Sequence, residues 1–252
     1  MSSPQIVQIP VFAVQSPIED QAMSSPQIDD MPTMSSLQID HIQSLHSNLS
    51  LYRESLYKEI ISVLGTDPKP INIFAYGSLI FKPERSFSTP RRCKALGVKR
   101  RFYMNSFDHR GTLSFPGRVC ALLSSTDSLD DSSFCEGILY TISSEDSYET
   151  ITSLAEREKG GYSFQRISVC VDGNETIESA FAFVTSSSSP FLAPFYEQDL
   201  NTTVKIIKSA HGPSGSNLSY FLSLYKALQS LGIRDNYMEE LHEIIIKQEQ
   251  VE

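Results

Sequence analysis

INIFAYGSL, residues 71 to 79, is the stretch from which the fold of this chain can be worked out. Ile71–Tyr76 is a β-type run and predicts a strand. Gly77 then allows a sharp turn, because it adopts conformations that other residues avoid. Successive backbone N–H groups in such a turn can form a concave anion site for a carboxylate or an oxyanion. A tight turn without a ligand explains the same residues equally well.

Outward from this turn, the pattern predicts one α+β domain over residues 71–252. Later runs rich in apolar and β-branched residues predict further strands, and the order of elements is not the regular alternation of a doubly wound sheet. Caps and apolar stripes predict the helices. The predicted strands are Arg118–Leu123, Gly137–Ile142, Gln165–Val171 and Ser179–Val184, and the predicted helices are Glu145–Glu158, Phe195–Ala210, Asn217–Leu231 and one beginning at Asp235.

The N-terminal part has a different character. Residues 1–40 repeat MSSPQI at 1–6 and 23–28 and MSSLQI at 34–39, and they are rich in Ser, Gln and Pro. We expect a disordered arm, and the alternative is a short interaction motif displayed several times, which would give the arm protein partners. Residues 41–70 form a helical extension and linker. Its apolar stripe is Ile42, Leu45, Leu49, Tyr52, Leu56 and Ile60, with Gly65 as the cap. This helix packs on the domain or mediates self-association.

Composition excludes several classes of function. The 252 residues are 40% hydrophobic and 20% charged, as in ordinary soluble globular proteins. A net charge of −9 argues against a nucleic-acid surface, and no apolar run is long enough to cross a membrane. Residues 1–40 lack Lys and Arg, so no basic targeting segment is recognisable and we expect a cytoplasmic protein with access to the nucleus. The four cysteines lack zinc-ligand spacing and are expected to be reduced thiols.

Glu158 is the candidate catalytic residue. In the predicted helix before it, Tyr148, Ile151 and Leu154 form an apolar stripe, and steps of three or four residues place Glu158 on the same inward face. Burial and the negative end of a helix both disfavour the charged carboxylate, so its pKa should rise into the range useful for a general base. The alternative is a solvated Glu at a fraying helix end, paired with Lys159.

Two other segments carry polar groups of interest. Arginines cluster at 100–101, 108–111 and 116–119, and guanidinium forks suit carboxylates, although a solvated rim with local Asp108–Arg110 pairing accounts for them too. HGPSGSN at 211–217 predicts a tight turn with an N-cap, in which His211 has a structural role. No spacing in the chain predicts a metal site.

Taken together, these segments resemble the ChaC-like glutathione-specific γ-glutamylcyclotransferases. The resemblance extends from about Ile73 to Lys247. The motifs that carry it are FAYGSLIF at 74–81, RRF at 100–102, DHRG at 108–111, PGRV at 116–119, REKGGY at 157–162 and HGPSGSN at 211–217. Each motif is weak alone, but six in this order and spacing are specific.

The resemblance implies a compact α+β fold around a small mixed β-barrel with flanking helices. It also implies a lyase that needs no cofactor and that converts glutathione into 5-oxoproline and cysteinylglycine in the cytoplasm. The catalytic Glu of the family matches Glu158, the residue that the helical period had already placed inward. The family's turn, which holds the γ-glutamyl group, matches the substrate-binding residues Ile73, Phe74, Ala75, Tyr76, Gly77, Ser78 and Leu79, and Arg118 and Tyr162 are further candidates.

The chain departs from the family pattern at several positions. Ala75 replaces a usual Gly, and its methyl group could narrow the pocket beside the turn. Phe81 and Tyr103 stand where Trp is frequent, and Phe191–Pro194 and Met104–Phe107 also differ. Two alternatives to glutathione cleavage therefore remain. One is cyclisation of other γ-glutamyl amines or dipeptides, and the other is a non-catalytic binding protein on the same fold.

Overall fold

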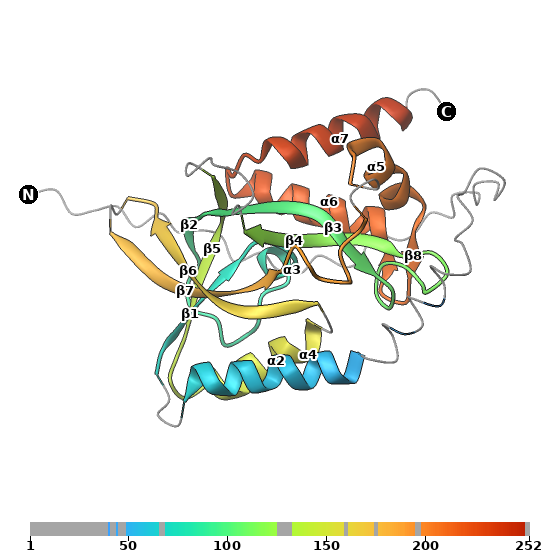
Figure 1. Cartoon of the computed structure of the whole chain (residues 1–252). Coiled ribbons are helices and arrows are strands. Elements are labelled where there is room, and N and C mark those ends of the chain that lie inside the picture. The colour runs from blue at the N-terminus through green and yellow to red at the C-terminus, as the bar shows by residue number, and fades with distance from the viewer. Residues whose placement is uncertain are drawn as a thin grey trace, which may run out of the picture. The chain divides into compact units, whose positions relative to one another are not determined.

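In the computed structural model, strands from both halves of the chain close into a barrel (Figure 1). The structure describes residues 40, 44, 49–65, 69–124, 133–158, 161–173, 176–194 and 198–249, all within one compact unit that begins at Met34. Within these residues five strands form the ring. They are, in spatial order, β1 (Ile71–Ala75), β5 (Phe134–Ile142), β2 (Arg91–Leu96), β6 (Tyr162–Val171) and β7 (Ile177–Thr185).

Both parallel and antiparallel pairs contribute to this barrel. Neighbours around the ring are antiparallel, except that β7 closes it by pairing in parallel with β1, where Ile73 lies opposite Phe181. Closure leaves the ring strands without free edges, and their inward side chains fill the core. Ile73, Ala95, Ile138 and Ala180 are fully buried there. The predicted small mixed barrel is confirmed.

A two-stranded ribbon extends the sheet beyond the ring. β3 (Val98–Ser106) and β4 (Gly117–Ser124) pair antiparallel, and β4 joins β7 where Leu123 lies opposite Thr185. Neither β2 nor β3 was predicted from the sequence. β3 has strict alternation, but one of its inward positions is Arg100, which sequence reasoning assigns to the surface. The RRF motif therefore lies on a buried strand and not on a rim.

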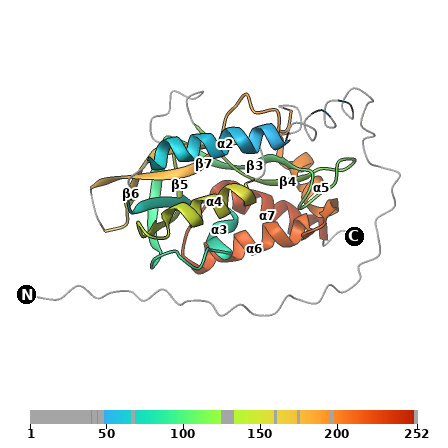
Figure 2. The same cartoon turned by 90° about the horizontal axis from the view of Figure 1, so that it is seen from below.

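Helices cover the strands from two sides. α2 (Leu49–Leu64) and α4 (Ser147–Arg157) lie together on one side, and α5 (Leu200–Ser209), α6 (Asn217–Ser230) and α7 (Asn236–Glu249) lie on the other (Figure 1). The view from below in Figure 2 shows α3 and α4 between α2 and α6. The short helix α3 (Ser78–Phe81) follows β1, and the hairpin β8–β9 (His211–Gly212 and Gly215–Ser216) joins α5 to α6.

The predicted helices are present with shorter bounds. α4 begins after its N-cap residue, Asp146. The backbone N–H of Asp146 donates to Ser143 Oγ at 3.1 Å, so Ser143 binds Asp146 and does not itself cap the helix. α5 is capped by Asp199, which accepts from the N–H of Thr202. On α6, the sequence predicts an inward stripe through Leu218, Phe221, Leu222, Tyr225 and Leu228. Phe221 and Leu228 are buried, whereas Leu218, Leu222 and Tyr225 are half-buried and Tyr220 and Leu224 are buried in their place.

α2 packs on the barrel rather than standing free. Leu56 and Ile60 are buried in the main core, and Gly65, at φ +66°, ends the helix as predicted. Glu59 Oε2 accepts the backbone N–H of Phe164 on β6 at 3.0 Å. Ile42, Leu45 and the MSSPQI repeats lie outside the described residues.

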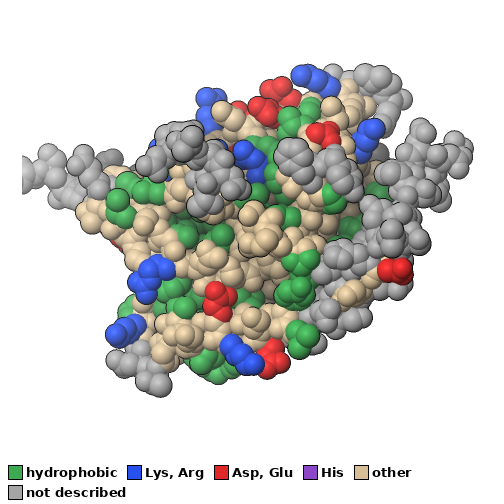
Figure 3. All heavy atoms as spheres, viewed as in Figure 1, with side chains coloured by type: hydrophobic (Ala, Val, Ile, Leu, Met, Phe, Trp, Pro, Cys, Tyr) green, Lys and Arg blue, Asp and Glu red, His purple; other side chains and the backbone are tan. Residues whose placement is uncertain are grey.

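Other predictions concern the cysteines and the surface. All four cysteines are free thiols, as expected. None of the helices described is both long and apolar enough to span a bilayer. On the face shown in Figure 3, basic and acidic side chains of the described residues are interspersed and form no continuous basic stripe.

Candidate active site

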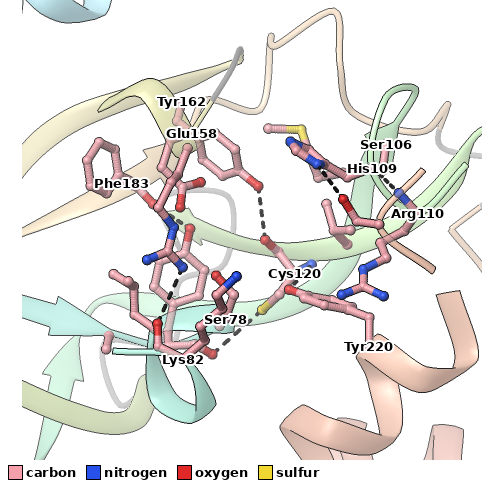
Figure 4. A pocket seen from close by; sticks show the side chains of 18 of the residues that line it. Ser78, Lys82, Ser106, His109, Arg110, Cys120, Glu158, Tyr162, Phe183 and Tyr220 are labelled. Carbon is pink, nitrogen blue, oxygen red and sulfur yellow. Dashed lines mark hydrogen bonds between the residues drawn. The ribbon is translucent and has the colours of Figure 1, made fainter. Parts of the chain in front are cut away.

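A cavity of about 410 Å³ opens between the end of β1, the ribbon β3–β4 and the start of α6. Its wall combines an apolar floor with polar groups at both ends, as ligand sites usually do. Among the described residues, those that line it include Phe74–Leu79, Asn105–Arg110, Cys120, Glu158, Tyr162 and Tyr220 (Figure 4).

The turn after β1 forms one end of the cavity. Leu79 and Ile80 are buried and anchor α3, while Gly77 precedes the helix without a side chain that could cap it. The first N–H groups of a helix have no acceptor within the helix, and the N–H of Ile80 already donates to Gly77 O at 3.0 Å, so the amides that a ligand could bind here are those of Gly77 and Ser78. Tyr76 is fixed on both sides, because its hydroxyl donates to Phe183 O at 2.6 Å and its carbonyl accepts from Arg100 Nε at 2.8 Å.

Glu158 faces the turn from the opposite wall (Figure 4). It is the C-cap of α4, and its N–H donates to Leu154 O at 3.0 Å, which fixes the backbone from which the carboxylate projects. Burial raises the pKa of Glu158 to about 7, and neighbouring Arg157 opposes this shift. The guanidinium of Arg157 is paired with Glu84. Glu158 therefore lies in the cavity and its pKa shifts in the predicted direction, although Tyr148 of the predicted apolar stripe is 54% exposed. Lys159 lies outside the described residues.

Between Glu158 and the ribbon the wall is polar but uncharged. Tyr162 donates its hydroxyl to Cys120 O at 3.2 Å, and the hydroxyl of Tyr220 accepts the N–H of Cys120 at 3.4 Å. Burial raises the pKa of all three side chains, so they stay protonated at neutral pH. A buried lining of neutral groups leaves the Glu158 carboxylate poorly solvated, which is the physical cause of its raised pKa.

The other end of the cavity is built from the β3–β4 loop and the β8–β9 hairpin. His109 Nδ1 lies 3.0 Å from Ser214 Oγ, and the Ser214 N–H donates to His109 O at 2.9 Å. Arg110 Nη1 donates to Ser216 O at 3.2 Å and to Ser219 Oγ at 3.3 Å. Gly212 lies so close to His109 O that a Cβ there would clash at 2.2 Å. The DHRG and HGPSGSN motifs therefore hold these two loops against each other.

The structure brings most of the predicted site residues together. Phe74 to Leu79, Glu158 and Tyr162 all line the cavity. Of the positions that depart from the family pattern, those that line it are Ala75, Phe81, Met104–Phe107 and Phe191. Ile73 instead lies inside the barrel.

Two of the arginines considered as carboxylate binders have other partners. Arg118 is buried and does not itself line the cavity, although its Nη1 donates to Asn105 Oδ1, which does. Arg100 is also buried and pairs with Asp235. Substrate contact by Arg118 therefore stays a prediction without a place in the described cavity wall.

Sequence reasoning missed several residues of the wall. Cys120 and Phe183 are ordinary strand residues and carry no local signal of a site. Tyr220 lies on α6. The available sequence signal for it was a side chain with a polar hydroxyl on the inward face of a helix, next to Phe221. Among the described residues no group of three or more His, Cys, Asp or Glu gathers in a way that could hold a metal ion.

The fold and the site define a class of protein: a mixed barrel whose cavity sets the carboxylate of Glu158 opposite the turn that follows β1. A family model described as ChaC-like protein matches residues 71–248. The chain belongs to this ChaC-like family.

Similar proteins of known activity support this assignment. A glutathione-specific gamma-glutamylcyclotransferase of Schizosaccharomyces pombe is 32% identical over 191 residues, covering 71% of this chain and 93% of the relative. One of Escherichia coli K12 is 30% identical over 179 residues, covering 69% and 72%. The crystal structure of a yeast γ-glutamyl cyclotransferase specific to glutathione matches with a TM-score of 0.66 at 26% identity, over 71% of this chain and 96% of the yeast chain.

Proposed function

We propose that this chain cleaves glutathione into 5-oxoproline and cysteinylglycine, with Glu158 as the general base. The observation that carries the proposal is the Glu158 carboxylate, whose pKa is raised to about 7 in a cavity that also holds the Tyr76–Leu79 turn. Relatives that cover most of the matched region bear the name of this activity.

The reaction needs no nucleophile from the protein. The α-amine nitrogen of the γ-glutamyl group bonds to its own γ-carbonyl carbon, and the bond from that carbon to the cysteinyl nitrogen breaks. Held geometry favours such an intramolecular attack. The turn supplies this geometry by binding the γ-glutamyl group, its free amides gripping either the α-carboxylate or the developing oxyanion.

Proton transfer is the task of Glu158. The α-ammonium must lose a proton before its nitrogen can attack, and an α-amino group has a pKa of roughly 8. A carboxylate with a pKa of about 7 is matched to accept that proton near neutral pH. Glu158 then returns a proton to the cysteinyl nitrogen as it leaves, so the enzyme ends in its starting state.

The test is release of 5-oxoproline from glutathione by the purified protein and by Glu158→Gln. We expect clear turnover by the parent and a loss of at least about 10²-fold in the variant, the lower range for a missing general base. Glu156→Gln is the matched control, because Glu156 is exposed on the same helix and its removal should leave the rate unchanged.

Other outcomes separate the alternatives. Equal turnover by the parent and by Glu158→Gln would leave the reaction standing but remove Glu158 as its base. Activity on γ-glutamyl-alanine but not on glutathione would favour a cyclotransferase for other γ-glutamyl dipeptides. If the parent is silent with both substrates, the chain is a binding protein on this fold.

A further inference from the structure

Arg110 lies at the end of the cavity away from Glu158. Its guanidinium stacks over the Tyr220 ring, 5.4 Å from the ring centroid, while the hydroxyl of the same tyrosine lies 3.6 Å from where a Cβ on Gly77 would be. Tyr220 therefore separates Arg110 from the Tyr76–Leu79 turn. Figure 4 shows Arg110 and Glu158 on opposite sides of the cavity, with Cys120 between them.

Arg110 is held in one orientation by neutral groups. Its Nη1 donates to Ser216 O and Ser219 Oγ, and its backbone N–H donates to Ser106 Oγ at 3.1 Å. None of these partners carries a charge that would neutralise the guanidinium. A fork whose position is already fixed loses little entropy when it binds a carboxylate.

The other cations of the described cavity wall are less suited to this role. Arg157 is engaged by the carboxylate of Glu84 and by the carbonyl of Lys82. Lys82 itself is exposed and directly follows α3, on the same wall as the turn. Arg110 thus combines partial burial, uncharged hydrogen-bond partners and distance from the turn.

The geometry points to Arg110 as the residue that binds the carboxylate of the glycine end of the substrate. This inference rests on the proposed function, because it concerns glutathione in the same cavity. Glutathione carries carboxylates at both ends, and the proposed function places its γ-glutamyl end at the turn. The second needs a cation on the far side of Tyr220, and a guanidinium binds a carboxylate through two parallel hydrogen bonds.

The electrostatics agree with this role. Burial lowers the pKa of Arg110, although Tyr220 opposes the shift, so the guanidinium has lost part of its hydration without gaining an anion in return. A carboxylate that enters the cavity replaces that lost hydration with a direct charge-assisted bond. Arg110 then selects substrates by the carboxylate at the cysteinylglycine end. A γ-glutamyl amine without that carboxylate cannot make this contact.

The experiment compares glutathione with its glycine monoethyl ester, in which an uncharged ethyl ester replaces the carboxylate at that end. Release of 5-oxoproline is measured with the parent, Arg110→Gln, Arg110→Lys and Lys82→Gln. We expect the parent to prefer glutathione by about 10- to 100-fold in kcat/KM, the usual effect of a hydrogen bond to a charged group. Arg110→Gln should turn over both substrates with the efficiency that the parent shows on the ester, Arg110→Lys should regain part of the preference, and Lys82→Gln should keep the parent's preference.

Several results would overturn the inference. If the parent turns over glutathione and its ester with equal efficiency, no cation of the protein binds the glycine carboxylate. An Arg110→Gln variant that loses both substrates equally, or keeps the preference, shows that Arg110 only docks the two loops. If the parent turns over neither substrate, the proposed function itself fails, and the role of Arg110 fails with it.

Discussion

At the scale of single residues, the ionised carboxylate of Glu158, which is the form that acts as a base, should destabilise the folded protein. Its pKa is 4.5 in an unstructured chain and about 7 in the folded protein, so between these values the folded state binds more protons than the unfolded one. The free energy of unfolding therefore falls as the pH rises through this window. We expect Glu158→Gln to be more stable than the parent by about 1–3 kcal/mol at pH 8.

Denaturant unfolding at several pH values measures this difference. The gain should shrink as the pH is lowered and disappear near 4.5, where the parent carries a neutral Glu158 as well. Glu156→Gln, on an exposed residue, should show no such pH dependence. A variant less stable than the parent at pH 8 would show that the Glu158 carboxylate is well solvated or paired, and would remove the physical basis for its role as a base.

The position of Glu158 could be predicted because a helix repeats regularly, so the inward face of α4 extends to its cap. The neighbours that set its pKa could not be predicted in the same way. Cys120 and Tyr220 approach it only after β4 and α6 pack together, and they are far from it in the sequence. Local patterns locate a group on a face, whereas its electrostatic environment depends on tertiary contacts.

At the scale of elements, α2 lies outside the residues that the family model matches, yet it belongs to the fold. Its Tyr52 ring packs edge-on against Phe191 in the cavity wall, with centroids 5.1 Å apart, and Leu56 is only 3% exposed. We expect Leu56→Ala to lower the free energy of unfolding by about 2–5 kcal/mol, the usual cost of such a core truncation.

Leu51→Ala is the matched control for Leu56→Ala. Leu51 lies on the same helix and is 63% exposed, so its truncation should change the free energy of unfolding by no more than about 0.5 kcal/mol. Thermal unfolding followed by circular dichroism compares the two. Equal effects would mean that α2 is an appendage, and the boundary at residue 71 proposed from the sequence would then mark the whole stable domain.

Elements with clean apolar runs were predictable, whereas β3, which carries a buried charge at an inward position, was not. The stripe of α2 and the β-branched runs of β6 and β7 follow ordinary patterns. β3 breaks the pattern because Arg100 occupies an inward position, where its charge is matched by a partner far along the chain. No local sequence pattern reveals that partner, so the sequence did not predict a strand there.

At the scale of the whole molecule, Arg100 joins three distant parts of the chain. Its fully buried guanidinium donates to Tyr76 O at the end of β1, to Glu136 O on β5 at 2.5 Å, and to Asp235 Oδ2 at 2.6 Å. Asp235 also caps α7, since its Oδ1 accepts the N–H of Met238 at 3.2 Å. This one ion pair therefore fixes α7 to the barrel and supports the turn that begins the candidate site.

Removing Asp235 should expose how much the fold depends on this connection. Asp235→Ala leaves a buried cation unpaired and should lower the free energy of unfolding by about 3–5 kcal/mol. Asp235→Asn should cost less, because its single amide oxygen can still either cap α7 or accept from Arg100, whereas Asp235 does both with its two oxygens. Lys247→Ala is the matched control, since its pair with Glu243 on α7 is exposed and worth at most about 0.5 kcal/mol. Chemical denaturation ranks the three, and an Asp235→Ala variant no less stable than Lys247→Ala would show that Arg100 is satisfied by the two carbonyls alone.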